Sequence, residues 1–179
     1  MALCGDAVAG AAAEQLVAPI LEDQRLTVVY RGHAHCAMSR ALLAQGRPVE
    51  AEEHARKALD ANRAVPAYRL RALALLLMSL RAQDRAHEAD PLAAEGLRLR
   101  ASLGSTGRTE LLFLLAVIEL RLELGQRAAA SELLAEGMRQ LDARAQRIPG
   151  RELRHSFLNG LRTHVRLREL AQQIIGSPA

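Results

Sequence analysis

The sequence predicts an all-α protein, and three observations lead to this prediction. Half of the 179 residues are apolar, but only two Phe, two Tyr and no Trp are present, so Leu, Ala and Val must form the core. Ala and Leu favour helices, whereas residues that favour strands are scarce. Apolar residues also recur at steps of three and four over most of the chain, which is the period of one helix face.

Several residues mark where helices are expected to begin, bend or end. Pro19 is expected to kink or end the first helix, because proline removes a backbone donor and clashes with the preceding turn. Pro48 suits the first position of a later helix, where its missing donor would be unbonded in any case. Ser105 or Thr106 is expected to cap another helix. A break is plausible at Asn159-Gly160.

One helix–turn–helix stretch, Ser39–Leu59, recurs along the chain in altered form. Its small residues Ala51, Ala55 and Ala58 lie four and three positions apart, so a neighbouring helix can approach closely. Superposing three turns aligns small and apolar residues on either side of them. The aligned sets are the turn residues Gly46, Asp84 and Gly125, then Ala51, Ala89 and Ala130, then Ala58, Gly96 and Gly137, and before the turns Leu42, Leu80 and Arg121.

This pattern resembles a tetratricopeptide (TPR) array, in which paired helices cross through small residues and a glycine lies in the turn. The spacings from Ala51 to Ala89 and from Ala89 to Ala130 are 38 and 41 residues, longer than the usual TPR length of about 34. Long repeats of this kind are similar to TPR regions on the C-terminal side of bacterial signalling proteins, such as serine/threonine kinases, nucleotide cyclases and signal-transduction ATPases.

The resemblance implies a single TPR-like domain over 1–179, folded as a right-handed α-α superhelix. The helix expected over 66–82 is apolar nearly all round, so it should lie at the centre. The expected units are a leading helix over 6–22, repeats over 24–61, 66–100 and 108–145, and a capping helix over 151–175.

The resemblance also implies a non-catalytic scaffold that presents a groove to a protein or peptide, as the interaction or regulatory part of a bacterial signalling protein. Arg121 occupies a normally apolar position, so either it binds an acidic group of the ligand or the local register differs. The expected groove residues are polar ones on the first helix of each repeat: His35, Ser39, Arg69, Arg71, Glu119 and Arg121.

No metal or catalytic site is expected. His33, His35 and Cys36 are metal-ligand types, but residues two apart on a helix point in different directions, and a structural site usually has four ligands. No motif marks a nucleophile with its base and orienting acid. The chain is therefore not expected to be an enzyme or to need a cofactor.

The alternative function is binding of nucleic acid or an anionic surface through an Arg-rich C-terminal segment. Between Arg144 and Leu170, seven Arg are accompanied by two Glu, whereas the whole chain has a net charge of +4. The outer face of a capping helix would have the same composition, and few aromatic residues are available for base stacking. The residues of this basic patch are Arg151, Arg154, Arg162, Arg166 and Arg168.

A cytoplasmic location is expected, because Cys4 and Cys36 form no disulfide framework and the sequence shows no secretory signal. The longest apolar runs, 72–78 and 111–118, are far shorter than the roughly 20 residues that span a bilayer. The oligomeric state is open, and self-association is compatible with the sequence.

Overall fold

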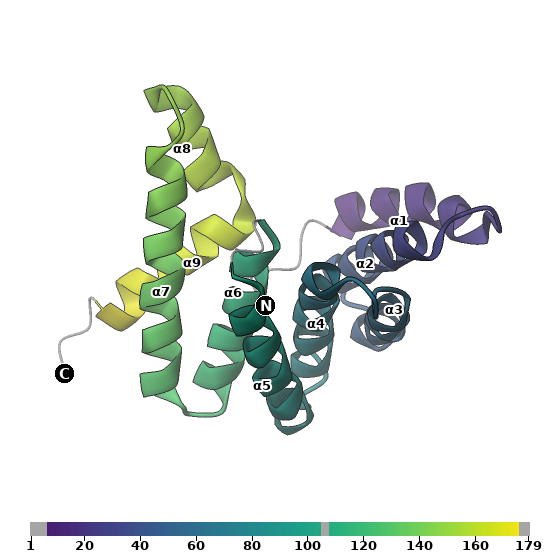
Figure 1. The fold of residues 1–179 in the computed structure, drawn as a ribbon, viewed down its shortest axis with the longest axis horizontal. Helices are drawn as coiled ribbons and strands as arrows, with labels where there is room; N and C mark the ends of the chain where they lie inside the picture. The colour runs from purple at the N-terminus through teal and green to yellow at the C-terminus, as the bar shows by residue number, and fades with distance from the viewer. Residues whose placement is uncertain (1–6, 105–107, 176–179) are drawn as a thin grey trace.

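The computed structural model describes residues 7–104 and 108–175, and within these ranges the chain forms nine α-helices (Figure 1). The prediction of an all-α fold is confirmed, since no residue in these ranges belongs to a strand. Ser105 and Thr106, one of which was expected to cap a helix, lie outside them. The helices are α1 (Ala7–Glu22), α2 (Val28–Ala44), α3 (Pro48–Ala61), α4 (Pro66–Arg81), α5 (Ala86–Leu103), α6 (Arg108–Glu123), α7 (Arg127–Gln146), α8 (Arg151–Gly160) and α9 (Arg162–Ile175).

α1 continues through Pro19, in line with the leading helix expected over 6–22, and Pro19 lies on its exposed side. Two other segments differ from the expected helices. α2 begins four residues later than expected, because the Asp23 carboxylate accepts bonds from the backbone and guanidinium of Arg25 and holds the chain in a turn. The segment 151–175 forms two helices, divided at Leu161 by extended backbone (φ −106°, ψ 119°), next to the expected break.

Neighbouring helices pack against one another along the whole array. α2, α4 and α6 lie side by side, with α3 packed on α2 and α4, and α5 packed on α4 and α6. α7 packs on α6, and α9 packs on both α6 and α7. α9 therefore takes the place of the first helix of a further pair. α8 contacts α7 and α9, and Figure 1 shows it at the end of α7, with α9 crossing α7.

α4 lies at the centre of the core, as its apolar character predicts. Its side chains from Leu70 to Leu80 are buried, except for Arg71 and Met78, which are half-buried. One apolar cluster joins α4 to α2, α3, α5 and α6, and a second joins α6 to α7 and α9. Because α6 contributes to both clusters, it connects the two halves of the array.

The longest helix in the described residues, α7, has 20 residues but carries charged and amide side chains along its length. Across the same residues, no helix combines the length and apolar character needed to span a membrane.

Candidate functional site

The turn between α2 and α3 is tied to α1 by a polar network. Gln45 and Arg47 in the turn both donate to one Glu14 carboxylate oxygen on α1, each at 2.7 Å. These hydrogen bonds hold the pKa of Glu14 below its usual range. Arg47 also forms a two-bond ion pair with Glu50 in the first turn of α3. A carboxylate from one helix therefore fixes the turn that joins the next two.

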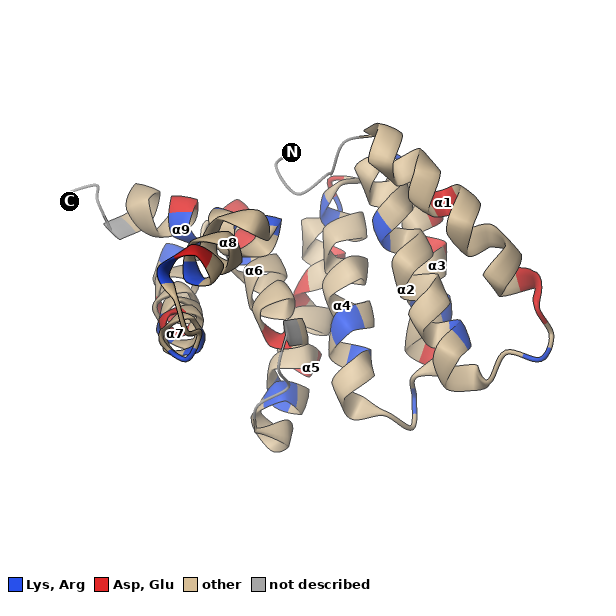
Figure 2. Ribbon diagram, turned by 90° about the horizontal axis from the view of Figure 1, so that it is seen from above, with Lys and Arg blue, Asp and Glu red and all other residues tan. Residues whose placement is uncertain are grey.

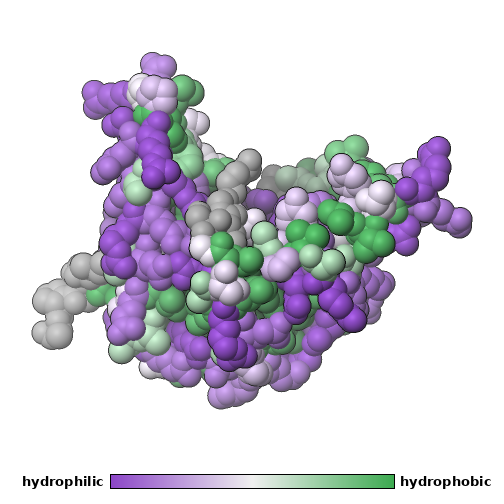
Figure 3. Space-filling view, viewed as in Figure 1, coloured by the Kyte–Doolittle hydropathy of each residue, from purple (hydrophilic) through white to green (hydrophobic). Residues whose placement is uncertain are grey.

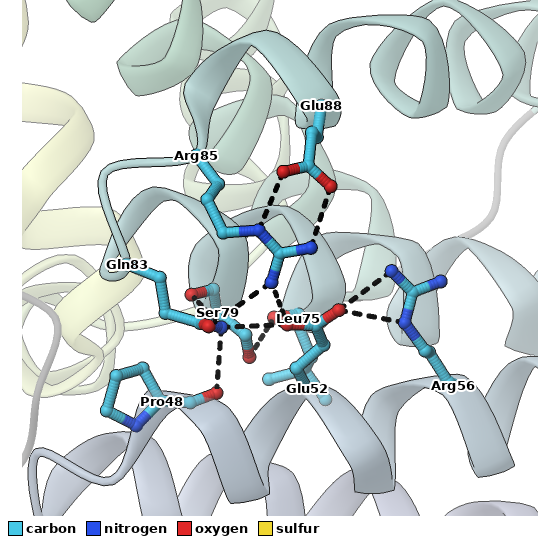
Figure 4. Close-up of polar contacts among 8 residues, drawn as sticks. All are labelled: Pro48, Glu52, Arg56, Leu75, Ser79, Gln83, Arg85 and Glu88. Atoms are coloured by element: carbon cyan, nitrogen blue, oxygen red, sulfur yellow. Dashed lines mark hydrogen bonds and ion pairs between the residues drawn. The ribbon is translucent and has the colours of Figure 1, made fainter.

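The turn between α4 and α5 has the same network (Figure 4). Gln83 and Arg85 donate to one oxygen of Glu52 on α3, at 2.8 and 2.6 Å, and Arg85 pairs with Glu88 through two bonds. Arg56 donates to the other Glu52 oxygen. Burial raises the pKa of Glu52, but the hydrogen bonds from Gln83 and Arg56 outweigh it, so this pKa lies below its usual range.

A single shift of 38 residues relates the two networks. It converts Glu14, Gln45 and Arg47 into Glu52, Gln83 and Arg85, and it also superposes the ion-paired glutamates at the start of α3 and α5. The carboxylate on α1 thus has the same contacts with its turn as the carboxylate on α3, which accepts from Arg56 as well. α1 therefore has the same place beside the α2–α3 turn that α3 has beside the α4–α5 turn.

The turn between α6 and α7 has a modified network. Gln126 stands where the earlier turns have Arg47 and Arg85. Asp90, at the equivalent carboxylate position on α5, pairs instead with Arg121 in the last turn of α6. Arg121 also donates to Gln126 at 2.5 Å. The arginine that pairs with the carboxylate lies in the preceding helix in this repeat, and not in the turn. This pairing accounts for Arg121 at a position where the other repeats have Leu42 and Leu80.

Several of the residues expected to line a groove contact the second helix of their own pair. His35 of α2 faces His54 of α3, with their Nδ1 atoms 3.0 Å apart. Arg69 of α4 donates to Glu95 of α5 at 2.8 Å. Ser39 is fully buried in α2. His35 and Arg69 therefore join the two helices of their pairs, and a ligand reaches these two side chains only by displacing existing contacts.

Glu119 of α6, also expected in the groove, joins three of the side-by-side helices. Its carboxylate accepts from Arg81 of α4 at 2.9 Å and from Arg166 of α9 at 2.8 Å. All three side chains are at least three-quarters buried. Glu119 therefore links α4, α6 and α9, and its charge is already balanced within the chain.

Arg71, the remaining expected groove residue, lies where α2 and α4 pack side by side. The rings of His33 on α2 and Tyr68 on α4 are in contact, with centroids 4.3 Å apart. Arg71 follows Tyr68 by three positions and Arg40 follows His33 by seven, so each arginine shares its helix side with one of the rings. We call His33, Arg40, Tyr68 and Arg71 the α2–α4 surface.

The α2–α4 surface is basic and its arginines are not neutralised. Arg40 is exposed and Arg71 is half-buried, and neither has a hydrogen-bond or ion-pair partner in the part of the chain that the structure describes. Burial and then the charge of Arg71 lower the pKa of His33, so the imidazole is neutral at physiological pH. This surface can offer two guanidinium groups and two rings to an acidic ligand.

The sequence interpretation missed three residues of this surface. His33 stands 38 residues before Arg71, so comparing equivalent repeat positions would have identified it. Tyr68 has Tyr30 at its equivalent position, and the paired tyrosines were a usable signal. Nothing in the sequence distinguishes Arg40, because its equivalents are Met78 and Glu119.

The arginines expected to form a C-terminal basic patch have separate surroundings. Arg154 donates to the carbonyl oxygen of Ala145 in α7 and to that of Ile148, just after α7 ends. Arg166 pairs with carboxylates of α6 and α9, and Arg168 donates to an amide oxygen of α8. Arg151 and Arg162 are exposed. In Figure 2, basic and acidic residues are interspersed over α7, α8 and α9 rather than separated.

Cys36 of α2 is buried in the apolar core, and burial raises the pKa of its thiol to about 11. Among the residues that the structure describes, no three His, Cys, Asp or Glu side chains are placed to hold a metal ion.

No protein-family model matches the chain. No curated protein and no solved structure matches it either. The functional interpretation of the site therefore rests on its geometry.

Proposed function

We propose that the chain is a non-catalytic scaffold of TPR-like helix pairs, wound as a right-handed superhelix, that binds an acidic peptide segment of a protein. The 38-residue shift between turn networks supports the repeat assignment. The small residues Ala58, Gly96 and Gly137 support it as well, because a small residue recurs at the equivalent position of α3, α5 and α7. The role in bacterial signalling is part of this proposal and rests on the resemblance alone.

The observation that carries the binding proposal is the α2–α4 surface. Most charges elsewhere on the side-by-side helices are neutralised within the chain, as Glu119 shows with Arg81 and Arg166. Arg40 and Arg71 are not neutralised, and Tyr68 adds exposed aromatic area beside them. Arginine and aromatic side chains are the types that contribute most to protein interfaces. Two carboxylates of a ligand would restore the charge balance that α6 and α9 obtain internally.

The binding proposal is tested by selecting ligands from a random library. Random 12-residue peptides displayed on phage are selected on the wild-type chain, and the winners are titrated by fluorescence anisotropy. We expect peptides enriched in Asp and Glu, and a loss of at least about tenfold in affinity for the R40E/R71E variant.

The matched control is R98E/R139E, which makes the same charge change at exposed arginines on α5 and α7. It should bind the selected peptides nearly as well as the wild type. Selected peptides without acidic residues, or equal losses in both variants, would show that the α2–α4 surface is not the binding site.

A further inference from the structure

The outer face of α1 is an apolar surface whose equivalent on α3 is covered by a helix. The 38-residue shift that superposes Glu14 on Glu52 also superposes Ala13, Leu16 and Ile20 on Ala51, His54 and Ala58. On α3, Ala51 and Ala58 are fully buried and His54 contacts His35 of α2. The face of α3 that includes these residues is therefore covered by its own first helix.

The corresponding face of α1 has no such cover in the described structure. Leu16 is 74% exposed and Ile20 is 45% exposed, whereas on α3 the equivalent His54 is half-buried and the equivalent Ala58 is fully buried. The opposite side of α1 is covered: Gly10 packs against α2, and Val17, Ala18 and Leu21 pack on the core. Figure 3 shows hydrophobic surface over the N-terminal helices, whereas the α7–α8 end is mostly hydrophilic.

The chemistry of this face favours a second copy of the same face as its occupant. Its side chains are Ala9, Ala12, Ala13, Leu16 and Ile20, so two copies can meet without burying an unpaired charge. The alanines allow close approach of two helices. A two-fold axis perpendicular to α1 makes the two copies of α1 antiparallel. α2 and α3 are also antiparallel, because a tight turn joins them.

The other end of the array is a poor occupant for this face. α9 takes the position of a first helix, so head-to-tail stacking would place it on α1 of the next copy. Its exposed residues include Gln172 and Gln173, and burial of their amides against Leu16 would leave polar groups without partners. End-to-end assembly is therefore disfavoured relative to pairing of two α1 helices.

We propose that two copies of the chain associate through α1, each α1 covering the face of the other that includes Leu16 and Ile20. One pair of 16-residue helices buries less area than a standard stable interface, so the dimer is weak. We expect a dissociation constant on the order of 100 μM. The proposal goes beyond peptide binding, since it uses a different face of the molecule.

Sedimentation equilibrium over a concentration series tests this interface. The wild type is expected to shift from monomer to dimer, and Leu16→Glu to raise the dissociation constant at least about tenfold. Leu153→Glu is the control, because Leu153 is a similarly exposed leucine on α8 and should leave the dimer unchanged. A wild type that stays monomeric at millimolar concentration, or a dimer that Leu16→Glu does not weaken, overturns the proposal.

Hydrogen exchange on the unmodified chain gives a test without substitutions. Backbone amides of α1 are expected to exchange more slowly as concentration rises, while those of α8 stay unchanged. A dimer that forms without slower exchange in α1 contradicts the proposed interface.

Discussion

Glu52 holds together three helices through one nearly buried carboxylate. It belongs to α3, accepts from the turn that joins α4 to α5, and also accepts from Arg56 on its own helix. At 9% exposure it is the most enclosed of the turn-network carboxylates, so solvent screens its ion pairs less than those of Glu14. Its removal leaves Gln83 and Arg85 without their shared acceptor.

Replacing Glu52 with Ala should lower the free energy of unfolding by about 2 kcal/mol, because two arginines and an amide lose a charged acceptor in a partly buried site. The measurement is urea denaturation followed by circular dichroism. Glu53→Ala is the control, since Glu53 is the exposed neighbour on the same helix and should change stability by less than about 0.5 kcal/mol. Equal effects of the two substitutions would mean that the turn network does not join the helices.

His35 is expected to make stability depend on pH. Burial, and then the charges of His54, Lys57 and Arg31, lower the pKa of His35 to about 4. In the unfolded chain its pKa is about 6.5, so between these values the unfolded state binds a proton that the folded state does not. The free energy of unfolding therefore falls as the pH falls through this window, by on the order of 2 kcal/mol.

Comparing wild type with His35→Leu tests this effect, and leucine is a suitable replacement because it stands at the equivalent positions of α4 and α6. Urea denaturation at pH 7 and at pH 5 should show a smaller loss in the variant. The turn-network glutamates stay ionised over this range, since their pKa values lie below the usual one. An unchanged pH dependence in His35→Leu would exclude His35 as the source.

Two glycines at equivalent positions of α5 and α7 have different amounts of space around them. Gly96 of α5 and Gly137 of α7 occupy the same position in their repeats. A Cβ on Gly96 would lie 2.3 Å from the Phe113 ring, which is fully buried in α6. A Cβ on Gly137 would lie 3.7 Å from its nearest neighbour, at ordinary contact distance.

Alanine substitutions at these two glycines should therefore have opposite effects. Gly96→Ala is expected to lose about 1–3 kcal/mol, because Phe113 must move in a packed core. Gly137→Ala is expected to gain about 0.5–1 kcal/mol, because alanine favours the helix and fits without a clash. Thermal unfolding of both variants measures the difference, and a stabilising Gly96→Ala would contradict the packing of α5 on α6.

At this scale the sequence predicted the helices well, because apolar period, alanine content and turn residues all indicate local structure. It did not predict the start of α2, and it left open whether Pro19 kinks or ends the first helix. Those features depend on one side chain, Asp23, that bonds back to its own turn, and on which side of α1 faces solvent. The site residues were harder to predict. His35 and Arg69 are polar residues on first helices, but only the packed structure shows that they already contact His54 and Glu95.

At the scale of the whole molecule, the described helices are compatible with one helix-pair unit that recurs from α1 onward. The sequence alignment of the turns indicated this repeat, and the position of Arg121 was its clearest irregularity. The two interpretations left open for Arg121 were a ligand contact and a local change of register. In the structure it pairs with Asp90, so it performs the part that Arg47 and Arg85 perform from the turn. Sequence alone could not show this, because the pairing joins α5 to α6 across 31 positions.

A double-mutant cycle at this third turn tests the repeat most directly. Arg121→Leu installs the leucine of the other repeats, and Gln126→Arg installs their turn arginine. If the turns are equivalent, the arginine introduced in the turn of the double variant pairs with Asp90. The two substitutions together should then be more stable than their separate effects predict, by about 1 kcal/mol. Effects that add within about 0.3 kcal/mol would contradict the equivalence of the turns on which the repeat rests.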